Sequence, residues 1–211
     1  MDGVIVDTEP LHRKAYFNMF SDVEIAVSEA LFTSFTGQAT YNICTQLVCD
    51  FQLTHTPKVL VEKKRAHFKY LFENDQSLQL IDGVLDLIKD YHANGLTLVL
   101  ASSASMPNID RIFERFNLNQ YFSAKLSGAD LKASKPHPEI FIKATEASGF
   151  SKSECMVIED STNGIKAANS AGIFCVGFNS ENSKNQNYNE ANLVINQFNE
   201  IEFKKINALL T

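Results

Sequence analysis

The sequence predicts an α/β fold, a doubly wound parallel sheet with a small helical domain inserted near its start. From residue 82 onward, short apolar runs alternate with amphipathic helices, which is typical of a parallel sheet covered on both faces. Residues 11–80 instead hold seven phenylalanines at helix-like spacings and no convincing strand-turn-strand signal. A length of 211 residues with 45% hydrophobic residues fits one large domain, or a core plus a small insert, with a packed interior.

The expected elements of the core follow one another from residue 84. Apolar residues spaced i, i+3, i+4 and i+7 predict a helix over 84–91, with Gly95 as its C-terminal stop. The largely apolar segment 96–101 predicts a buried strand, and helical spacing returns over 109–116. The remaining predictions are a helix at about 138–148, a strand at 155–158, a helix ending at Gly172, strands at 173–178 and 193–195 around a polar loop at 179–189, and a closing helix near 199–210.

Two segments of sequence are expected to form the core, 1–10 and 81–211, with 11–80 as the inserted helical domain. The two connections, near 8–10 and 80–83, would then act as a paired hinge. The phenylalanines of the insert most simply form its own hydrophobic core, because aromatic side chains are usually buried by packing and only seldom stack on a ligand.

Charge and composition exclude several classes of protein. The net charge is −6 and the longest block of like charge is Lys63–Arg65, so the basic surface of a nucleic-acid binder is missing; that run is most simply a solvated helix face. No apolar run approaches the length of a membrane span, and residues 1–20 lack a signal-peptide pattern. The four cysteines contain no C-x-x-C pair. We therefore expect a reduced, cytoplasmic protein with neither a nucleic-acid nor a membrane partner.

Polar residues follow the expected strands at one edge of the sheet. Asp2, Ser102 and Asp160 each follow an apolar run, or would do so if the chain extended upstream. Ligands of open α/β sheets bind beyond the carboxyl ends of the strands. Lys135 follows a loop and precedes Pro136, whose fixed φ restrains the backbone. We therefore expect these residues to converge on one site.

Each of these signals has a second interpretation. Glu159 and Asp160 together are costly at the end of a buried strand unless a hard divalent cation such as Mg²⁺ compensates them. An acidic helix N-terminus, capped by Asp160 or by the serine after it, is an equally good explanation. Ser102 and Ser103 can donate to phosphate oxygens or cap the next helix. A single lysine such as Lys135 is usually solvated surface.

Four segments, taken together, resemble a known family. They are Met1–His12 (MDGVIVDTEPLH), Leu100–Ser103 (LASS), Ser134–Pro138 (SKPHP) and Ile158–Ile165 (IEDSTNGI). In this order they are similar to the motifs of the haloacid dehalogenase-like phosphotransferases, and within these to the β-phosphoglucomutase-like group of sugar phosphatases and phosphomutases. The resemblance covers nearly the whole chain and implies a Rossmann-like core with a helical cap domain at 11–80.

The resemblance implies phosphoryl transfer through an aspartyl-phosphate. The first motif of the family begins Asp-x-Asp-Gly, in which the first Asp is the nucleophile and the second is the general acid and base. The second corresponds to Asp2, and the first falls immediately before Met1. The spacing suits a strand, because residues i and i+2 point to the same side. We expect the natural protein to extend upstream of Met1 with an apolar run that ends in this nucleophile.

Further roles are implied by the same resemblance. Asp160 would ligate Mg²⁺ together with the nucleophile and the backbone carbonyl of Asp2, and Glu159 would be a metal partner, directly or through water. Thr8 and His12 match hinge-side positions that help to align the general acid and the cap, and histidine suits proton work near neutral pH. The residues expected at the phosphate and substrate are Ser102, Ser103 and Lys135 from the core, and Gly37 and Arg65 from the cap.

Departures from the mutase pattern favour hydrolysis over isomerisation. Where the mutase cap carries an arginine three residues after its glycine, here Gly37, this chain has Thr40. A serine and a lysine that grip a second phosphate after Ser102 are replaced by Ala104 and Ser105. A mutase must bind phosphate at both ends of its substrate, and half of the residues that would bind the second phosphate are absent.

The leading hypothesis is therefore a monomeric, Mg²⁺-dependent phosphatase whose substrate is a small phosphorylated metabolite, most simply a sugar phosphate. A β-phosphoglucomutase-like sugar phosphomutase is the first alternative. The second alternative is a non-catalytic protein that binds Mg²⁺ and phosphate, which would apply if Met1 is the true start.

Overall fold

The computed structural model describes the whole chain except residues 36–37, 39, 76–77, 181–182, 184 and 211. Two compact units share the chain. The α/β unit consists of Met1–Asp7 and Gln79–Thr211, and the helical unit of Thr8–Leu78. None of the helices formed by the described residues is long and apolar enough to cross a lipid bilayer.

The strands of the α/β unit are all parallel. Within the described residues there are five of them in two sheets, ordered β1-β2 and β3-β4-β5. Each strand ends beside the end of its neighbour, so that Ser102 of β1 lies opposite Ser127 of β2, and Glu159 of β3 lies opposite Gly177 of β4. The strands are β1 (Leu98–Ser102), β2 (Phe122–Ser127), β3 (Met156–Glu159), β4 (Phe174–Phe178) and β5 (Leu193–Ile195).

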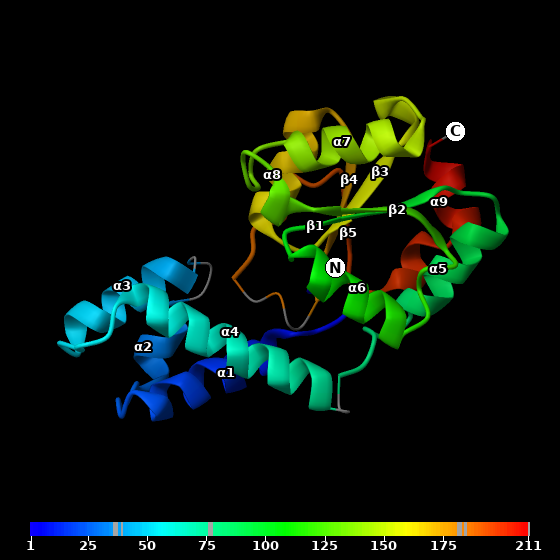
Figure 1. Cartoon of the computed structure of the whole chain (residues 1–211). Coiled ribbons are helices and arrows are strands. Elements are labelled where there is room, and N and C mark those ends of the chain that lie inside the picture. The colour runs from blue at the N-terminus through cyan, green and yellow to red at the C-terminus, as the bar shows by residue number, and fades with distance from the viewer. Residues whose placement is uncertain (36–37, 39, 76–77, 181–182, 184, 211) are drawn as a thin grey trace. The chain divides into compact units, whose positions relative to one another are not determined.

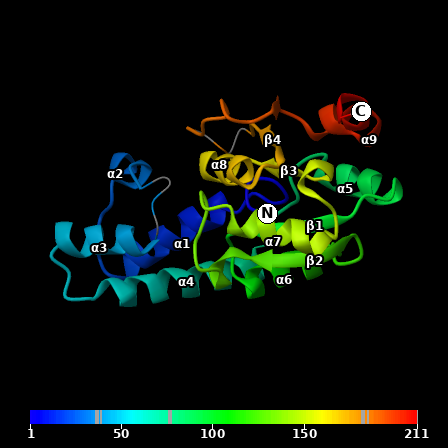
Figure 2. The same cartoon turned by 90° about the horizontal axis from the view of Figure 1, so that it is seen from above.

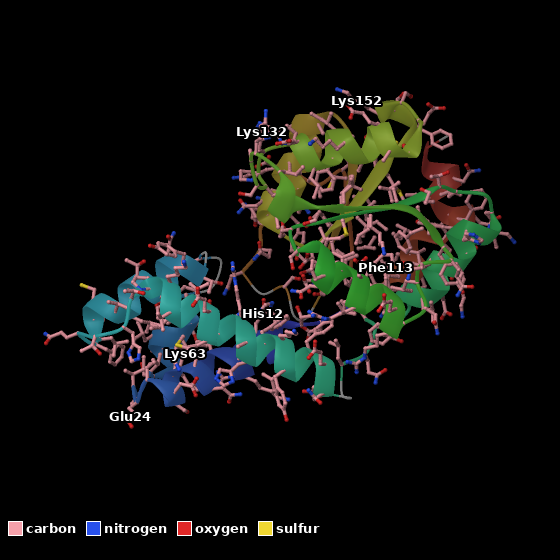
Figure 3. All side chains as sticks on the ribbon, in the orientation of Figure 1. His12, Glu24, Lys63, Phe113, Lys132 and Lys152 are labelled. Atoms are coloured by element: carbon pink, nitrogen blue, oxygen red, sulfur yellow. The ribbon has the colours of Figure 1, made fainter. Side chains whose placement is uncertain are left out.

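Helices cover both sides of these strands, with α7 and α8 on one side and α5 and α6 on the other (Figure 1). Two of them, α7 and α8, end at glycines in the left-handed conformation, Gly149 and Gly172, as expected for helix C-caps. Phe113 points into the unit, whereas Lys132 and Lys152 point outward (Figure 3). The helices are α5 (Val84–Ala93), α6 (Met106–Arg115), α7 (Glu139–Ser148), α8 (Thr162–Ala171) and α9 (Phe203–Leu210), with short 3₁₀ turns η1 (Gly128–Asp130), η2 (Lys152–Glu154) and η3 (Phe198–Ile201).

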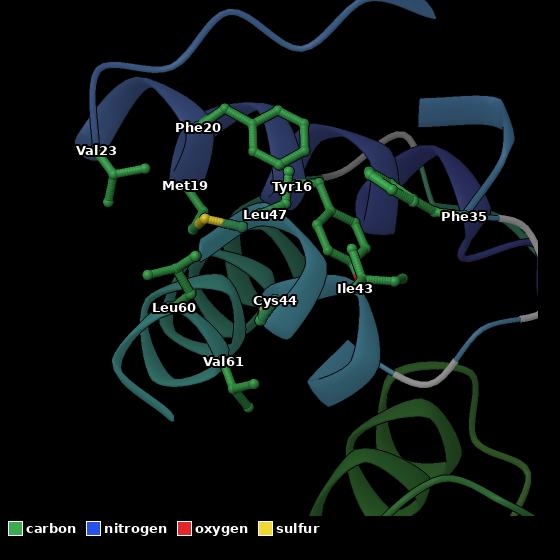
Figure 4. Close-up of a cluster of buried hydrophobic side chains, with 10 residues drawn as sticks. All are labelled: Tyr16, Met19, Phe20, Val23, Phe35, Ile43, Cys44, Leu47, Leu60 and Val61. Carbon is green, nitrogen blue, oxygen red and sulfur yellow. The ribbon is translucent and has the colours of Figure 1, made fainter. Parts of the chain in front are cut away.

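The helical unit is built around its longest helix, α4 (Pro57–Asn74), which runs beside α1 (Glu9–Asp22) (Figure 2) and also packs on α3 (Thr40–Asp50). Thr56 begins α4 by accepting a hydrogen bond from Val59 N, with Pro57 in the first turn. The short helix α2 (Glu29–Thr33) completes the unit. Its hydrophobic core, shown in Figure 4, consists of Tyr16, Met19, Phe20, Val23, Phe35, Ile43, Cys44, Leu47, Leu60 and Val61.

The α/β fold with parallel strands, predicted from the sequence, is confirmed, and the strand at 193–195 has the predicted bounds. One strand was not predicted, β2, whose sequence FSAKLS holds too few apolar residues to read as a buried run. The closing helix near 199–210 is interrupted, because η3 ends at Ile201 and α9 begins at Phe203. The basic run at Lys63–Arg65 is not simply a solvated face, since Lys64 is only 5% exposed.

Candidate active site

The turn after β3 is built around the buried carboxylate of Glu159. Its Oε2 accepts hydrogen bonds from the backbone N–H groups of Asp160 and Ser161, both at 3.0 Å, and from Ser161 Oγ at 2.9 Å. Ser161 Oγ in turn accepts from Gly164 N at 3.1 Å and so caps α8. The helix cap that the sequence left open between two residues is therefore Ser161, which leaves the side chain of Asp160 available for another role.

Lys135 forms an ion pair with Glu159 Oε1. The two side chains are only 11% and 9% exposed, and the Lys135 ammonium also lies 4.7 Å from the centre of the Phe141 ring. Burial alone would raise the pKa of the Glu159 carboxyl, but the charge and hydrogen bond of Lys135 hold that pKa below its ordinary value. Lys135, which precedes a cis peptide bond to Pro136, is thus part of a buried charged cluster and not solvated surface.

Two glycines allow this cluster to pack closely. Gly3 has a φ of +73°, and a Cβ atom there would lie 1.9 Å from Asp160 Oδ2. A Cβ at Gly164 would lie 2.0 Å from Glu159 Cδ. The Asp2–Gly3 segment therefore lies directly against Asp160, and the Met1 backbone nitrogen is within electrostatic reach of Asp2, Lys135, Glu159 and Asp160.

Asp160 is held at two points by the segment before β5. Ser183 Oγ donates to Asp160 Oδ2 at 2.7 Å, and the Tyr188 hydroxyl donates to the Asp160 carbonyl at 2.9 Å. Burial and the neighbouring Glu159 raise the pKa of the Asp160 carboxyl, and the hydrogen bond from Ser183 partly opposes this. A cation would relieve the cost of two adjacent buried carboxylates.

Ser102 and Ser103 lie at the end of β1. Ser102 is buried, and its Oγ accepts a hydrogen bond from Ala104 N at 3.2 Å. Neither serine caps the next helix, because α6 begins at Met106 after Ser105. Ser103 is exposed, and its Cα would lie 3.2 Å from a Cβ at Gly128, so β1 and β2 end in close contact. The capping interpretation of these serines is wrong, and the phosphate interpretation stays a prediction.

The oxygen atoms of the α/β unit that could coordinate Mg²⁺ suit this ion only if substrate or water completes the coordination. Among the described residues, no three His, Cys, Asp or Glu side chains are grouped closely enough to hold a metal on their own. Glu159 already accepts four hydrogen bonds, and Asp160 Oδ1 accepts none from a described side chain. Mg²⁺ characteristically binds through one or two carboxylates, retained waters and substrate phosphate. The oxygen donors of Asp160 and Asp2 fit that pattern.

The helical unit holds a second buried ammonium group, that of Lys64. Lys64 Nζ lies 2.7 Å from His12 Nδ1 and 5.0 and 5.1 Å from the ring centres of Tyr16 and Phe68. The His12 ring stacks on Phe68 with its centroid 4.2 Å away. Thr8, 2% exposed, precedes α1, and its carbonyl accepts a hydrogen bond from His12 N at 2.9 Å. Thr8 and His12 thus belong to one local network with Lys64.

The remaining expected substrate residues are also in this unit. Arg65 is exposed on α4, next to the inward-facing Lys64. Thr40, at the start of α3, has its side chain near the Tyr16 phenol, where it partly opposes the rise that burial causes in the Tyr16 pKa. Gly37 lies outside the residues that the structure describes.

Sequence reasoning missed Lys64, Ser183 and Tyr188. Lys64 was hidden in a basic run, although its spacing of four from Phe68 places both on one helix face. Ser183 and Tyr188 stand in a polar segment where neither periodicity nor a motif distinguishes them from ordinary loop residues.

Comparison with known proteins supports one family over most of the chain. The family model described as haloacid dehalogenase-like hydrolase matches residues 1–178. Fructose-1-phosphate phosphatase YqaB of Escherichia coli is 27% identical over 83% of this chain and 92% of its own length. The phosphorylated carbohydrates phosphatase of Thermotoga maritima is 29% identical over 82% of this chain and 79% of its own length.

Solved structures agree in fold. The β-phosphoglucomutase of Clostridium difficile matches with a TM-score of 0.76 at 25% identity, covering 99% of this chain and 93% of that one. CbbY of Rhodobacter sphaeroides, crystallised with phosphate, matches with a TM-score of 0.78 at 21% identity, covering 95% of this chain and 92% of that one. At that identity the second likeness concerns the fold alone.

Proposed function

Since the chain belongs to the haloacid dehalogenase-like hydrolases, we propose that it is a Mg²⁺-dependent phosphatase that hydrolyses a small phosphorylated metabolite, in particular a sugar phosphate. The observation that supports this best is the buried cluster in which Lys135 pairs with Glu159 while Gly3 packs against Asp160. A dianionic phosphate needs positive charge beside it, which the fixed Lys135 ammonium and a divalent metal held by Asp160 would supply together.

The proposed roles follow from this arrangement. Asp160 and the backbone carbonyl of Asp2 would hold Mg²⁺, which when bound offsets the negative charge of the phosphate and of the nucleophile. Lys135, fixed by Glu159, would neutralise one phosphate oxygen, and Ser102 with Ser103 would donate hydrogen bonds to others. Asp2 would protonate the leaving sugar oxygen and then take a proton from the attacking water. The nucleophilic carboxylate of this route corresponds to the position before Met1, which the sequence does not include.

We propose that the helical unit acts as the substrate-selecting cap. Thr8 and His12 would connect it to the chemistry at Asp2, with Lys64 fixing the His12 ring through Nδ1 so that Nε2 carries the proton. Gly37 and Arg65 would contact the part of the substrate away from the transferred phosphate. Thr40 stands where the mutases carry an arginine, and its side chain lies near the Tyr16 phenol.

Hydrolysis is favoured over isomerisation because the chain lacks half of the residues with which the mutases bind the second phosphate of a bisphosphate. The relatives named for phosphatases of fructose 1-phosphate and of phosphorylated carbohydrates support sugar phosphates as the substrate class. A sugar phosphomutase is the second candidate, favoured by the likeness to the β-phosphoglucomutase structure.

The test is release of inorganic phosphate from a panel of sugar and polyol monophosphates, with Mg²⁺ and with EDTA. Both the 211-residue chain and a protein that adds the residues encoded immediately upstream should be assayed. We expect turnover in the extended protein, lost in EDTA and reduced about 10²- to 10⁴-fold by Asp2→Asn. Asp86→Asn, an exposed carboxylate on α5, is the matched control and should have no effect.

Three outcomes separate the candidates. No phosphate release from any substrate in Mg²⁺ would contradict the phosphatase proposal. Interconversion of hexose 1- and 6-phosphates, primed by a bisphosphate and faster than phosphate release, would establish the mutase. Retained Mg²⁺ and phosphate binding with neither reaction in the extended protein would favour the non-catalytic binding protein.

A further inference from the structure

The segment from Ser183 to Tyr188 is hydrogen-bonded to the turn that carries Asp160, although the two are separated by more than twenty residues of sequence. Besides the two bonds to Asp160 itself, Gln186 Oε1 accepts from Thr162 N at 2.8 Å and from Thr162 Oγ1 at 2.9 Å. Thr162 Oγ1 also accepts from Asn187 N at 2.8 Å. These contacts are of two kinds, because those of Ser183 and Tyr188 reach Asp160 and those of Gln186 and Asn187 reach only Thr162.

Tyr188 is held in place by the sheet beneath it. A Cβ atom at Gly177 of β4 would lie 2.9 Å from Tyr188 Cδ1, so the missing side chain makes room for the phenol ring. The ring also packs against the hydrophobic cluster formed by α7 and α8. From this position the Tyr188 hydroxyl donates to the Asp160 carbonyl at 2.9 Å.

Ser183 is oriented by its own neighbour. Ser183 N donates to Ser180 Oγ at 3.2 Å, and the two hydroxyl oxygens lie 3.0 Å apart. Because Ser183 Oγ donates its single proton to Asp160 Oδ2, the hydrogen bond between the two hydroxyls must run from Ser180 to Ser183. The chain of donors is thus directed from Ser180 through Ser183 to the carboxylate, and Ser183 is only 9% exposed.

We propose that Ser183 and Tyr188 are positioning residues for Asp160, which fix the carboxylate so that Oδ1 is presented to the divalent cation. This inference rests on the proposed function and deepens it. A carboxylate that binds a hard cation through one oxygen is fixed when a hydrogen bond occupies the other, and partners of this kind commonly matter for metal affinity. Ser183 occupies Oδ2, Tyr188 fixes the backbone of the same residue, and Gly3, which has no side chain, allows the Asp2–Gly3 segment to pack against the carboxylate.

Calorimetric titration with Mg²⁺ alone tests the inference without turnover. Ser183→Ala should weaken Mg²⁺ binding about 10- to 100-fold, and Ser183→Thr, which keeps the hydroxyl, should restore most of it. Tyr188→Phe should weaken it roughly 3- to 10-fold through loss of one hydrogen bond. Gln186→Ala removes only the two hydrogen bonds to Thr162, keeps those of Ser183, Asn187 and Tyr188, and should leave the affinity nearly unchanged.

A second control accounts for stability. Tyr91→Phe removes another phenol-to-carbonyl hydrogen bond of the α/β unit, the 2.6 Å bond to Ile201 O, and should lower the unfolding midpoint without changing Mg²⁺ affinity. The inference is overturned if the parent chain binds no Mg²⁺, if Ser183→Ala binds within twofold of the parent, or if Gln186→Ala weakens binding as much as Ser183→Ala does. If Mg²⁺ binding depends on Ser183 but no phosphate is released, only the proposed function is contradicted. If phosphate is released but Mg²⁺ binding does not depend on Ser183, only this inference is contradicted.

Discussion

Among the residues that the structure describes, each unit has a lysine side chain that is largely buried, and these two lysines, Lys135 and Lys64, contact chemically different groups. In the α/β unit, Lys135 is paired with the carboxylate of Glu159, and both side chains are about one-tenth exposed. In the helical unit, Lys64 contacts the His12 imidazole and the faces of Tyr16 and Phe68. Removing the first ammonium leaves an opposite charge that is already desolvated, whereas removing the second ends a contact with the His12 ring and two cation–π contacts. The two clusters should therefore respond differently to the same substitution.

The largest effect is expected for Lys135→Met. Removing one member of a buried ion pair costs about 3–5 kcal/mol, because the remaining charge keeps its desolvation penalty without its partner. Urea unfolding of the parent and the variant at pH 7 measures this free energy. The double variant Lys135→Met/Glu159→Gln should recover part of the loss, and a double variant no more stable than the single one would contradict this account.

Lys64→Met should cost less, about 1–2 kcal/mol. The substitution loses the cation–π contacts with Tyr16 and Phe68 and the hydrogen bond to His12, while the methionine keeps much of the stem packed among aromatic rings. The same urea measurement applies, with Lys69→Met, an exposed lysine on the same helix, as the matched control. A cost equal to that of Lys135→Met would show that the two clusters do not differ in the way proposed.

The acid dependence of stability should reveal the Glu159 cluster. Its pKa is lowered in the folded protein, so Glu159 contributes stability that is complete above its ordinary pKa of 4.5 and is lost as the pH falls through the lower folded value. Unfolding free energies of the parent and Glu159→Gln, measured in EDTA from pH 7 to pH 3, should differ most at pH 7 and converge below pH 4.5. A difference that grows toward low pH would have the wrong sign.

The sequence predicted most of the α/β unit because most of its strands are short apolar runs. A polar residue directly after such a run then lies at the carboxyl end of the strand. Glu159 and Asp160 were found in that way, since parallel strands bring their carboxyl ends to one edge. Strand β2 was not found, because FSAKLS is stabilised by its pairing with β1 and not by a hydrophobic pattern of its own.

The contacts that set the chemistry of the site were less accessible from the sequence. Lys64 was assigned to a solvated helix face, and Lys135 was expected at the phosphate without any indication of a protein partner; only tertiary packing shows the specific contacts that each makes. Ser183 and Tyr188 reach Asp160 across more than twenty residues, so no local pattern could have linked them. A sequence motif predicts which residues lie at the end of a strand, but it does not indicate which distant side chains donate hydrogen bonds to them.

Two buried cysteines allow the comparison between the units to be followed site by site. Cys44 belongs to the core of the helical unit and Cys175 to β4, and both side chains are fully buried. Burial raises the pKa of the Cys44 thiol to about 11 and that of the Cys175 thiol to about 12. Alkylation, which requires the thiolate, should therefore occur only after local opening, and well after alkylation of the exposed Cys49.

Iodoacetamide labelling at pH 8, followed by peptide mass spectrometry, should then give opposite results for the two lysine variants. Lys135→Met should speed labelling of Cys175 more than that of Cys44, and Lys64→Met should do the reverse, if each unit opens by itself. In the open state the thiol reacts like an ordinary exposed cysteine in the parent and in the variants. A change in the labelling rate therefore reports a change in the population of the open state. Equal acceleration of both thiols by either variant would show that the units unfold as one cooperative structure, in which case a buried lysine in one stabilises the other.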